Sequence, residues 1–401
     1  MIVKNLNIAI VNAHWNNRGD EAALLAIIKG LKSYYTDSKI TIFFKDDKAI
    51  KQFPEIKNVD FLLAKFNEKI WDIWLASLTR GKVGINKTLK KTIKNLTKSQ
   101  LIIYSPGGSV INKRFFWRKQ MEYLVPFICA KLYKIPMKVA APSIGPFDTE
   151  KPNRLIKWLL KTPVSFCVRE EISRKYLEEI GLLENIYVTI DSAFYDEVNI
   201  TQNQKKLDEY VELNKFLASH GKVIGITITD FGWHVKYGKD KELVNRINQS
   251  FIKFIKMLTE KGYGIVFIPQ LFGNQNDYNY MNKFSVENIF TMNDKLDCFF
   301  QQFLISKLYA VVGMRYHSNI FSAKMGVPFI PIIYEEKMEG FIQQADLQKY
   351  SLTLNDLSFE QLSDKWQELE QNHISISRKI QEKQPVWKEK ALKTIELLTN
   401  D

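Results

Sequence analysis

Residues 311–340 read VVGMRYHSNIFSAKMGVPFIPIIYEEKMEG and decide how the rest of the chain is interpreted. An unbroken apolar run ends at Gly313, which is typical of a strand in a parallel sheet covered on both faces. Apolar residues then recur at helical spacing as far as Gly326, a glycine placed where helices end. Pro328 stops further helix, and residues 327–333 form a second apolar run. The order strand, helix, strand predicts a parallel α/β sheet.

Arg315 and His317 lie where the first of these strands gives way to the helix. Ligands bind at this edge of an open parallel sheet, and a helix N-terminus favours anions. Arg315 offers a fixed fork of donors for carboxylate or phosphate, and His317 can exchange a proton near neutral pH. Tyr334 and Lys337 follow the next strand, so we expect them at the same edge. The pattern predicts an anion clamp; the alternative is that Arg315 and His317 only cap the helix and bind sheet carbonyls.

The composition is that of a globular protein with more than one domain. The 401 residues predict two or three domains, and 45% hydrophobic and 25% charged residues are ordinary values. No apolar run reaches the ~20 residues of a spanning helix, and the N-terminal residues indicate a strand rather than a signal peptide. Cys129, Cys167 and Cys298 lie far apart in apolar sequence, so we expect buried free thiols of a cytoplasmic protein and no metal site.

The net charge of +13 favours anionic partners. The lysines are spread along the chain without a nucleic-acid-binding motif, so nucleic acid is not expected. Two aromatic and basic stretches, residues 66–96 and 115–134, are candidates for contact with a membrane surface or a lipid-linked acceptor. A solvated helix face is the alternative for residues 66–96.

The first βα unit of the chain provides a second candidate site. An apolar strand at residues 6–11 leads into a polar loop containing Asn17 and Gly19, and we expect Asp20 to cap the helix that follows. The N–H groups at such a helix start are available to a ligand. Asn17, Gly19 and Asp20 are therefore candidate binding residues, with simple capping as the alternative for Asp20.

Small residues follow two more strands. Gly107 and Gly108 come after one, and Ser143 and Gly145 after the next. Paired glycines let backbone N–H groups approach a ligand closely, although turns use glycine as well.

Two charged residues also stand at strand ends. Arg169 directly follows the strand at residues 164–168, in the same context as Arg315, and Asp191 ends the strand at residues 187–190. We include both among the candidate site residues.

Strands alternate with helices in both halves of the chain, which predicts two doubly wound Rossmann-like α/β domains facing a cleft, a GT-B-like architecture. The expected domains are residues 1–200 on the acceptor side and 201–350 on the donor side. The polar stretch at 201–207 marks the boundary. Residues 351–401 are expected to be helical, with Trp366 and Trp387 as anchors, and to pack back toward the first domain.

Taken together, these motifs resemble those of the polysaccharide pyruvyl transferase family, over most of the chain. The matching segments are NRGDEA at 17–22, Gly107-Gly108, SIGP at 143–146, Arg169 with Ser173 and Gly181, Asp191 with Ala193, and GMRYH at 313–317 with Gly326, Pro328, Tyr334, Lys337 and Gly340.

The resemblance implies transfer of a pyruvyl group from phosphoenolpyruvate to a sugar, with formation of a cyclic ketal. The donor carries a carboxylate and a phosphate, for which Arg169, Arg315 and Lys337 are the candidate cations. His317 is the candidate acid and base, and Asp191 the residue that orients it. The implied partners are phosphoenolpyruvate and a glycan or lipid-linked sugar, without cofactor or metal.

Two other functions remain open at this point. A nucleotide-sugar glycosyltransferase would use the same architecture, with Arg315 and Lys337 on the diphosphate. A non-catalytic scaffold would tolerate loss of Arg315 and His317. Contact with the inner face of the plasma membrane and assembly into a homo-oligomer are also left open.

Overall fold

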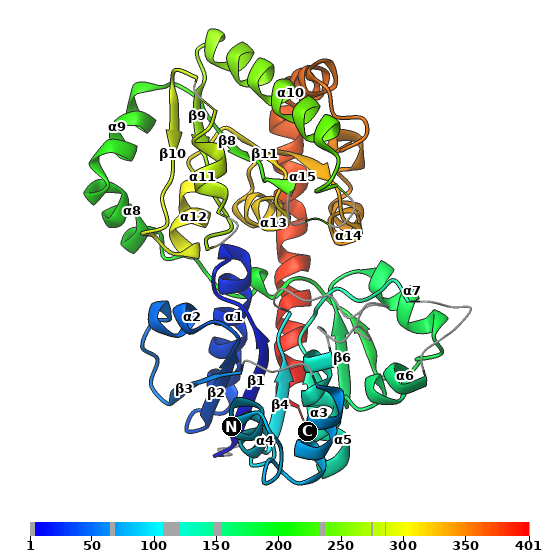
Figure 1. Ribbon diagram of the computed structural model, residues 1–401. Helices are drawn as coiled ribbons and strands as arrows, with labels where there is room; N and C mark the ends of the chain where they lie inside the picture. Colours follow the sequence, from blue (N-terminus) through cyan, green and yellow to red (C-terminus); the bar gives the residue numbers. More distant parts are fainter. Residues whose placement is uncertain are drawn as a thin grey trace. The chain divides into compact units, whose positions relative to one another are not determined.

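The computed structural model describes residues 5–64, 69–106, 121–147, 154–231, 234, 237–273, 276–284 and 286–400. The chain forms two compact units (Figure 1). Unit 1 comprises Met1–Trp15, Ala23–Asp196 and Glu389–Asp401, and unit 2 comprises Asn16–Ala22 and Glu197–Lys388. Each unit is built on its own sheet.

Unit 1 contains a parallel sheet of order β3-β2-β1-β4-β5-β6-β7. The order reverses between β1 and β4, which is the switch point of a doubly wound fold. The strands are β1 (Asn7–Ala13), β2 (Lys39–Phe44), β3 (Val59–Leu63), β4 (Leu101–Tyr104), β5 (Met137–Val139), β6 (Ser165–Val168) and β7 (Ile186–Val188). The helices are α1 (Arg18–Tyr34), α2 (Asp47–Gln52), α3 (Ile70–Leu78), α4 (Lys87–Leu96), α5 (Val125–Tyr133), α6 (Arg154–Leu160) and α7 (Glu171–Glu179).

Two cores cover the faces of this sheet because successive side chains of each strand point to opposite sides. Ala9 and Val11 of β1 pack with apolar residues of α3 to α7. Ile8 and Ile10 pack with those of α1, α2 and the end of α15 (Phe359–Thr399).

Unit 2 contains a second parallel sheet, of order β10-β9-β8-β11-β12-β13, with its switch point between β8 and β11. The strands are β8 (Val223–Thr227), β9 (Gly264–Phe267), β10 (Ile289–Thr291), β11 (Ala310–Gly313), β12 (Phe329–Ile333) and β13 (Leu352–Thr353). The helices are α8 (Ile200–Glu209), α9 (Val211–Ser219), α10 (Lys241–Glu260), α11 (Asp277–Met281), α12 (Cys298–Ile305), α13 (Tyr316–Met325) and α14 (Glu336–Ala345).

These sheets confirm the predicted fold class, two doubly wound α/β units. Trp366 and Trp387 are buried along α15, as expected of anchors. The three cysteines are buried and free. Burial raises the pKa of the Cys129 and Cys167 thiols to about 12, so both stay protonated at neutral pH.

Two short segments belong to one unit while the residues next to them in the chain belong to the other. Residues 16–22 belong with unit 2 although they begin α1, most of which belongs to unit 1. The end of α15 belongs with unit 1, where Thr394 Oγ1 donates to Thr189 Oγ1 at 2.8 Å and the Tyr35 hydroxyl donates to the Thr399 carbonyl. The stretch at 201–207, expected as a polar boundary, lies inside α8.

In the part of the chain that the structure describes, none of the helices combines the length and the hydrophobicity that crossing a membrane requires.

Candidate active site

The switch point of unit 2 is built around Thr227, the last residue of β8. Its Oγ1 accepts the N–H groups of Met314 at 3.0 Å and Arg315 at 3.3 Å, directly after β11. It is also hydrogen-bonded to Ser318 Oγ at 2.8 Å, and Ser318 Oγ donates to the Arg315 carbonyl at 2.6 Å. These bonds fix the turn that carries Arg315 into the start of α13.

Arg315 forms a buried, two-pronged ion pair with Asp277. Nε donates to Oδ2 at 3.1 Å and Nη2 to Oδ1 at 2.6 Å. Asp277 Oδ2 also accepts the N–H groups of Gln270 and Leu271, which follow β9. Burial acts to lower the pKa of Arg315, but the charges of Asp277 and Tyr334 outweigh it, so the pKa lies above its usual value. The guanidinium therefore stays charged and held in one plane.

Asp277 is the residue that sequence analysis missed. It is the first residue of α11, whose start is capped by Asn276 Oδ1 on the Tyr278 N–H at 2.8 Å. A signal existed, because an acidic residue at a helix start after β9 belongs at the same sheet edge as Arg315. The pairing itself joins residues 38 positions apart, which no local pattern specifies.

Tyr334 and Lys337 follow β12 and lie at the edge where the sequence predicts them. Burial and the charge of Glu335 raise the pKa of the Tyr334 hydroxyl, while Arg315 opposes the shift. Lys337 Nζ pairs with Glu335 Oε2 at 2.6 Å. Burial alone would raise the pKa of Glu335, but the charges of Lys337 and of His234 hold it below its usual value. Lys337 is thus a paired cation, held by Glu335 and 6.0 Å from the centre of the Tyr316 ring.

His317 lies against Gly19, which brings together two motifs almost 300 residues apart in the sequence. A Cβ atom at Gly19 would sit 1.8 Å from His317 Cγ and 1.9 Å from Nδ1. No side chain fits there unless the imidazole moves, so glycine is required by this contact. Both residues belong to unit 2, and His317 is buried in the first turn of α13.

The start of α1 corrects the expected role of Asp20. The helix begins at Arg18, and Asn17 Oδ1 accepts the Gly19 N–H at 2.9 Å. Asn17 is therefore the capping residue, and Asp20 lies within the first turn. An acidic side chain there still complements the helix dipole.

Arg18 connects this first turn to another part of unit 2. Arg18 Nη1 donates to Glu21 Oε2 at 2.5 Å, and Arg18 Nη2 donates to the Asp294 carbonyl at 2.9 Å. Burial raises the pKa of the Glu21 carboxyl, although Arg18 acts against the shift. Gly19 lies in the first turn of α1 and His317 in the first turn of α13, so the N-termini of the two helices meet at this contact. Both helix dipoles favour an anion there.

A second cluster of predicted site residues lies in unit 1, after β5, β6 and β7. Arg169 Nη1 donates to Asp191 Oδ2 at 2.8 Å, and Arg169 Nε donates to Ser143 Oγ at 2.8 Å. Asp191 Oδ1 also accepts the Ala193 N–H at 3.0 Å. Within unit 1 Asp191 thus pairs with Arg169, and a role in orienting His317 of unit 2 stays a prediction. Gly145 has φ +87°, and a Cβ there would lie 2.2 Å from the Tyr176 ring.

The remaining predicted residues, Gly107 and Gly108, lie outside the described residues. Just before them, at the switch point of unit 1, Asn12 Nδ2 donates to the Ser105 carbonyl at 3.1 Å. Among the described residues, no group of three or more His, Cys, Asp or Glu side chains is placed to hold a metal ion.

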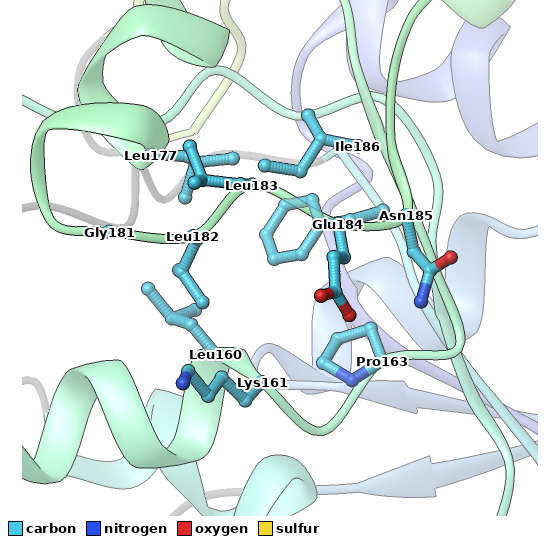
Figure 2. Close-up of a pocket in the computed structure, with 11 residues that line it drawn as sticks. Leu160, Lys161, Pro163, Leu177, Gly181, Leu182, Leu183, Glu184, Asn185 and Ile186 are labelled. Atoms are coloured by element: carbon cyan, nitrogen blue, oxygen red, sulfur yellow. The ribbon is translucent and has the colours of Figure 1, made fainter.

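A pocket of about 300 Å³ in unit 1 does not belong to either cluster (Figure 2). Phe166 near the start of β6 and Ile186 at the start of β7 contribute to its lining, together with Leu160, Leu177 and Leu182. It therefore lies at the edge where the strands begin, opposite the edge that carries Arg169 and Asp191. None of the predicted site residues lines it.

Comparison with known proteins shows which family the chain belongs to. A family model described as polysaccharide pyruvyl transferase matches residues 17–336, from Asn17 through Arg315 and His317 to the start of α14. The chain belongs to the polysaccharide pyruvyl transferase family. Membership in the pyruvyl transferase family makes it a transferase of polysaccharide biosynthesis.

One relative and two solved structures are similar to the chain over most of its length. The amylovoran biosynthesis protein AmsJ of Erwinia amylovora is 23% identical over 390 residues, covering 88% of this chain and 89% of AmsJ. A UDP-GlcNAc 2-epimerase from Neisseria meningitidis superposes with a TM-score of 0.61 at 15% identity, covering 99% and 100% of the two chains. A glycosyltransferase from Rickettsia africae gives 0.59 at 12% identity, covering 99% and 96%. At these identities the structures establish the fold, which this pyruvyl transferase family member shares with GT-B enzymes.

Proposed function

We propose that this protein transfers a pyruvyl group from phosphoenolpyruvate to two hydroxyls of a sugar, forming a ketal and releasing phosphate. The acceptor is a cell-surface polysaccharide or its lipid-linked precursor. Family membership supports the transferase class. The observation that carries the finer proposal is the contact of His317 with Gly19, where the N-termini of α1 and α13 meet.

The charge of the donor fits this edge of unit 2. Phosphoenolpyruvate is an anion with a carboxylate and a phosphate, and both groups favour helix N-termini and guanidinium forks. Asp277 holds the Arg315 guanidinium in a fixed plane, and Glu335 anchors Lys337. We assign donor binding to this edge, with Tyr334 beside Arg315.

The reaction then needs one proton donor and two acceptor hydroxyls. His317 protonates the methylene carbon of the donor, which becomes a methyl group, and a sugar hydroxyl forms a bond to the adjacent carbon while losing its proton to His317. The bond from that carbon to the phosphate oxygen breaks and phosphate leaves. The second hydroxyl forms the last C–O bond, and its proton leaves with the phosphate. A positioned proton donor of this kind accelerates such steps by about 10²–10⁴-fold.

Ligand-induced stabilisation distinguishes phosphoenolpyruvate from a nucleotide sugar as the donor. Melting temperatures of the wild type are measured with phosphoenolpyruvate and, separately, with UDP-, GDP- and CMP-sugars, because a ligand that binds the folded state raises the melting temperature. We expect stabilisation by phosphoenolpyruvate, and its reduction in Arg315→Lys, which keeps the charge and loses the fork. Stabilisation by a nucleotide sugar alone would instead establish a nucleotide-sugar glycosyltransferase.

A further inference from the structure

Helix α3 of unit 1 presents an apolar face to solvent. Four of its large apolar side chains are exposed by 36–63%, at helical spacing: Ile70, Trp71, Leu75 and Leu78. The opposite face of the same helix is buried and includes a carboxylate: Asp72, Ile73, Ala76 and Ser77. A helix that only faced water would place its charged residues outward and its apolar residues inward.

The loop after α3 extends this apolar surface, and hydrogen bonds fix its shape. The Asp72 carboxylate accepts the N–H groups of Ile85 at 2.7 Å and Asn86 at 3.0 Å. Thr79 Oγ1 accepts the Val83 N–H at 3.1 Å. Val83 and Ile85 are nevertheless 51% and 66% exposed. Their exposure is thus a property of an ordered loop, held in place by a buried carboxylate.

A group of cations surrounds these apolar residues. Residues 69–98 contain one acidic residue, the buried Asp72, and eight basic residues: Lys69, Arg80, Lys82, Lys87, Lys90, Lys91, Lys94 and Lys98. Within the described part of the chain, none of the eight forms an ion pair with a carboxylate. On α4 the lysines follow helical spacing, opposite a buried face of Leu89, Ile93 and Leu96.

We propose that this surface, formed by α3, the loop at 79–86 and α4, docks on an anionic lipid bilayer. The two helices lie together on one side of the first sheet (Figure 1), so their outward faces form one surface. Apolar side chains that enter the lipid interface, beside lysines that meet anionic headgroups, are the signature of a peripheral membrane site. A nucleic acid would use the lysines but not the apolar residues, and a protein partner would not require an excess of one charge sign. The inference concerns a surface of unit 1 and is independent of the proposed reaction.

The first experiment is cosedimentation of the full chain with lipid vesicles. The wild type is mixed with vesicles of pure phosphatidylcholine or of equimolar phosphatidylcholine and phosphatidylglycerol. We expect binding to the anionic vesicles, weakened by salt because exposed charges are screened. Absence of binding to the anionic vesicles at low salt would overturn the proposal.

Charge variants test the lysines. The triple variant Lys87→Gln, Lys91→Gln and Lys94→Gln removes three cations, for which the expected loss of vesicle affinity is roughly a hundredfold. The matched control changes three exposed lysines of unit 2 to Gln: Lys205, Lys215 and Lys239. Equal losses in both triples would show a net-charge effect and would contradict a specific surface.

Apolar variants test insertion. Leu78→Ser with Ile85→Ser is expected to reduce vesicle binding at least tenfold, a conservative figure at about 0.8 kcal/mol per buried CH₂. The control, Ile374→Ser with Val386→Ser, changes residues that are 75% and 50% exposed on α15. Unchanged binding of the Leu78/Ile85 variant would overturn the proposal. So would a lipid-free dimer that this variant abolishes in sedimentation velocity, because the surface would then serve self-association.

Discussion

The two units use the same pairing at the carboxyl edge of their sheets, yet they surround it differently. In each, an arginine after a strand is paired with a buried aspartate: Arg169 with Asp191 in unit 1, and Arg315 with Asp277 in unit 2. In unit 1 the neighbouring side chains include the Ser143 hydroxyl and the Glu170 carboxylate, whose Oε2 lies 3.6 Å from Arg169 Nε. In unit 2 the residue two positions on is His317, in contact with the start of α1. We therefore expect the pair to act structurally in both units, and the residues around it to decide whether proton chemistry is available.

Replacement of His317 should have the largest effect. In His317→Gln the phosphate released from phosphoenolpyruvate, with acceptor present, should fall by about 10²–10⁴-fold, because the proton donor is lost. His220→Gln is the matched control, since His220 packs on Phe216 with ring centroids 4.5 Å apart and takes no part in the site. Full activity of His317→Gln would show that His317 does not give unit 2 a proton-transfer role.

Loss of either aspartate should be the next largest effect, this time on stability. Asp277→Ala and Asp191→Ala each remove the aspartate that pairs with a buried guanidinium, which costs up to about 3–5 kcal/mol in the free energy of unfolding. Urea denaturation measures it. Asp60→Ala is the control, because its pair with Lys39 is exposed and such pairs contribute about 0–1 kcal/mol. If only one of the two variants lost little free energy of unfolding, the two buried pairs would differ in their contribution to stability.

Gly19→Ala tests the contact between Gly19 and His317, which lies in unit 2. The new methyl group would displace the His317 ring, and a misplacement of about 1 Å at a reacting group costs up to ~10²-fold in rate. Phosphate release is again the measurement. Gly221→Ala is a matched control, because a Cβ at Gly221 meets nothing within 4 Å. If Gly19→Ala keeps wild-type activity, the contact has no bearing on the reaction.

The smallest effect concerns the acid side of the stability curve. The pKa of Glu335 is lower in the folded protein, so ionised Glu335 adds stability above its ordinary pKa of 4.5. That contribution disappears as the pH falls through the lowered value. Thermal melts of Glu335→Gln between pH 7 and pH 3 should therefore show a weaker decline below pH 4.5 than the wild type. An identical decline would show that Lys337 does not depend on Glu335.

Local patterns predict the strands, the helices and the place of Arg315 and His317, because hydrophobic periodicity and terminal glycines are properties of neighbouring residues. They also place Arg169 and Ser143 at strand ends that prove to be adjacent. They do not predict that Asp277 pairs with Arg315 or that Asp191 pairs with Arg169, since partner choice depends on which strands become neighbours. The cap at Asn17 was assigned to Asp20 because both residue types cap helices and only the backbone decides between them.

The exchange of segments between the units bears on how the protein is made. Unit 1 buries Ile395 and Leu398 in one of its two cores, and Tyr35 and Thr189 hydrogen-bond to the same end of α15. A ribosome synthesises residues 197–388 before it reaches these residues. The first sheet therefore emerges early but cannot complete its core until all of unit 2 has been translated. Residues 16–22 are also made before the strands of unit 2, with which they pack in the folded protein. A fragment cut at residue 200 should therefore expose the apolar face that Ile395 and Leu398 cover.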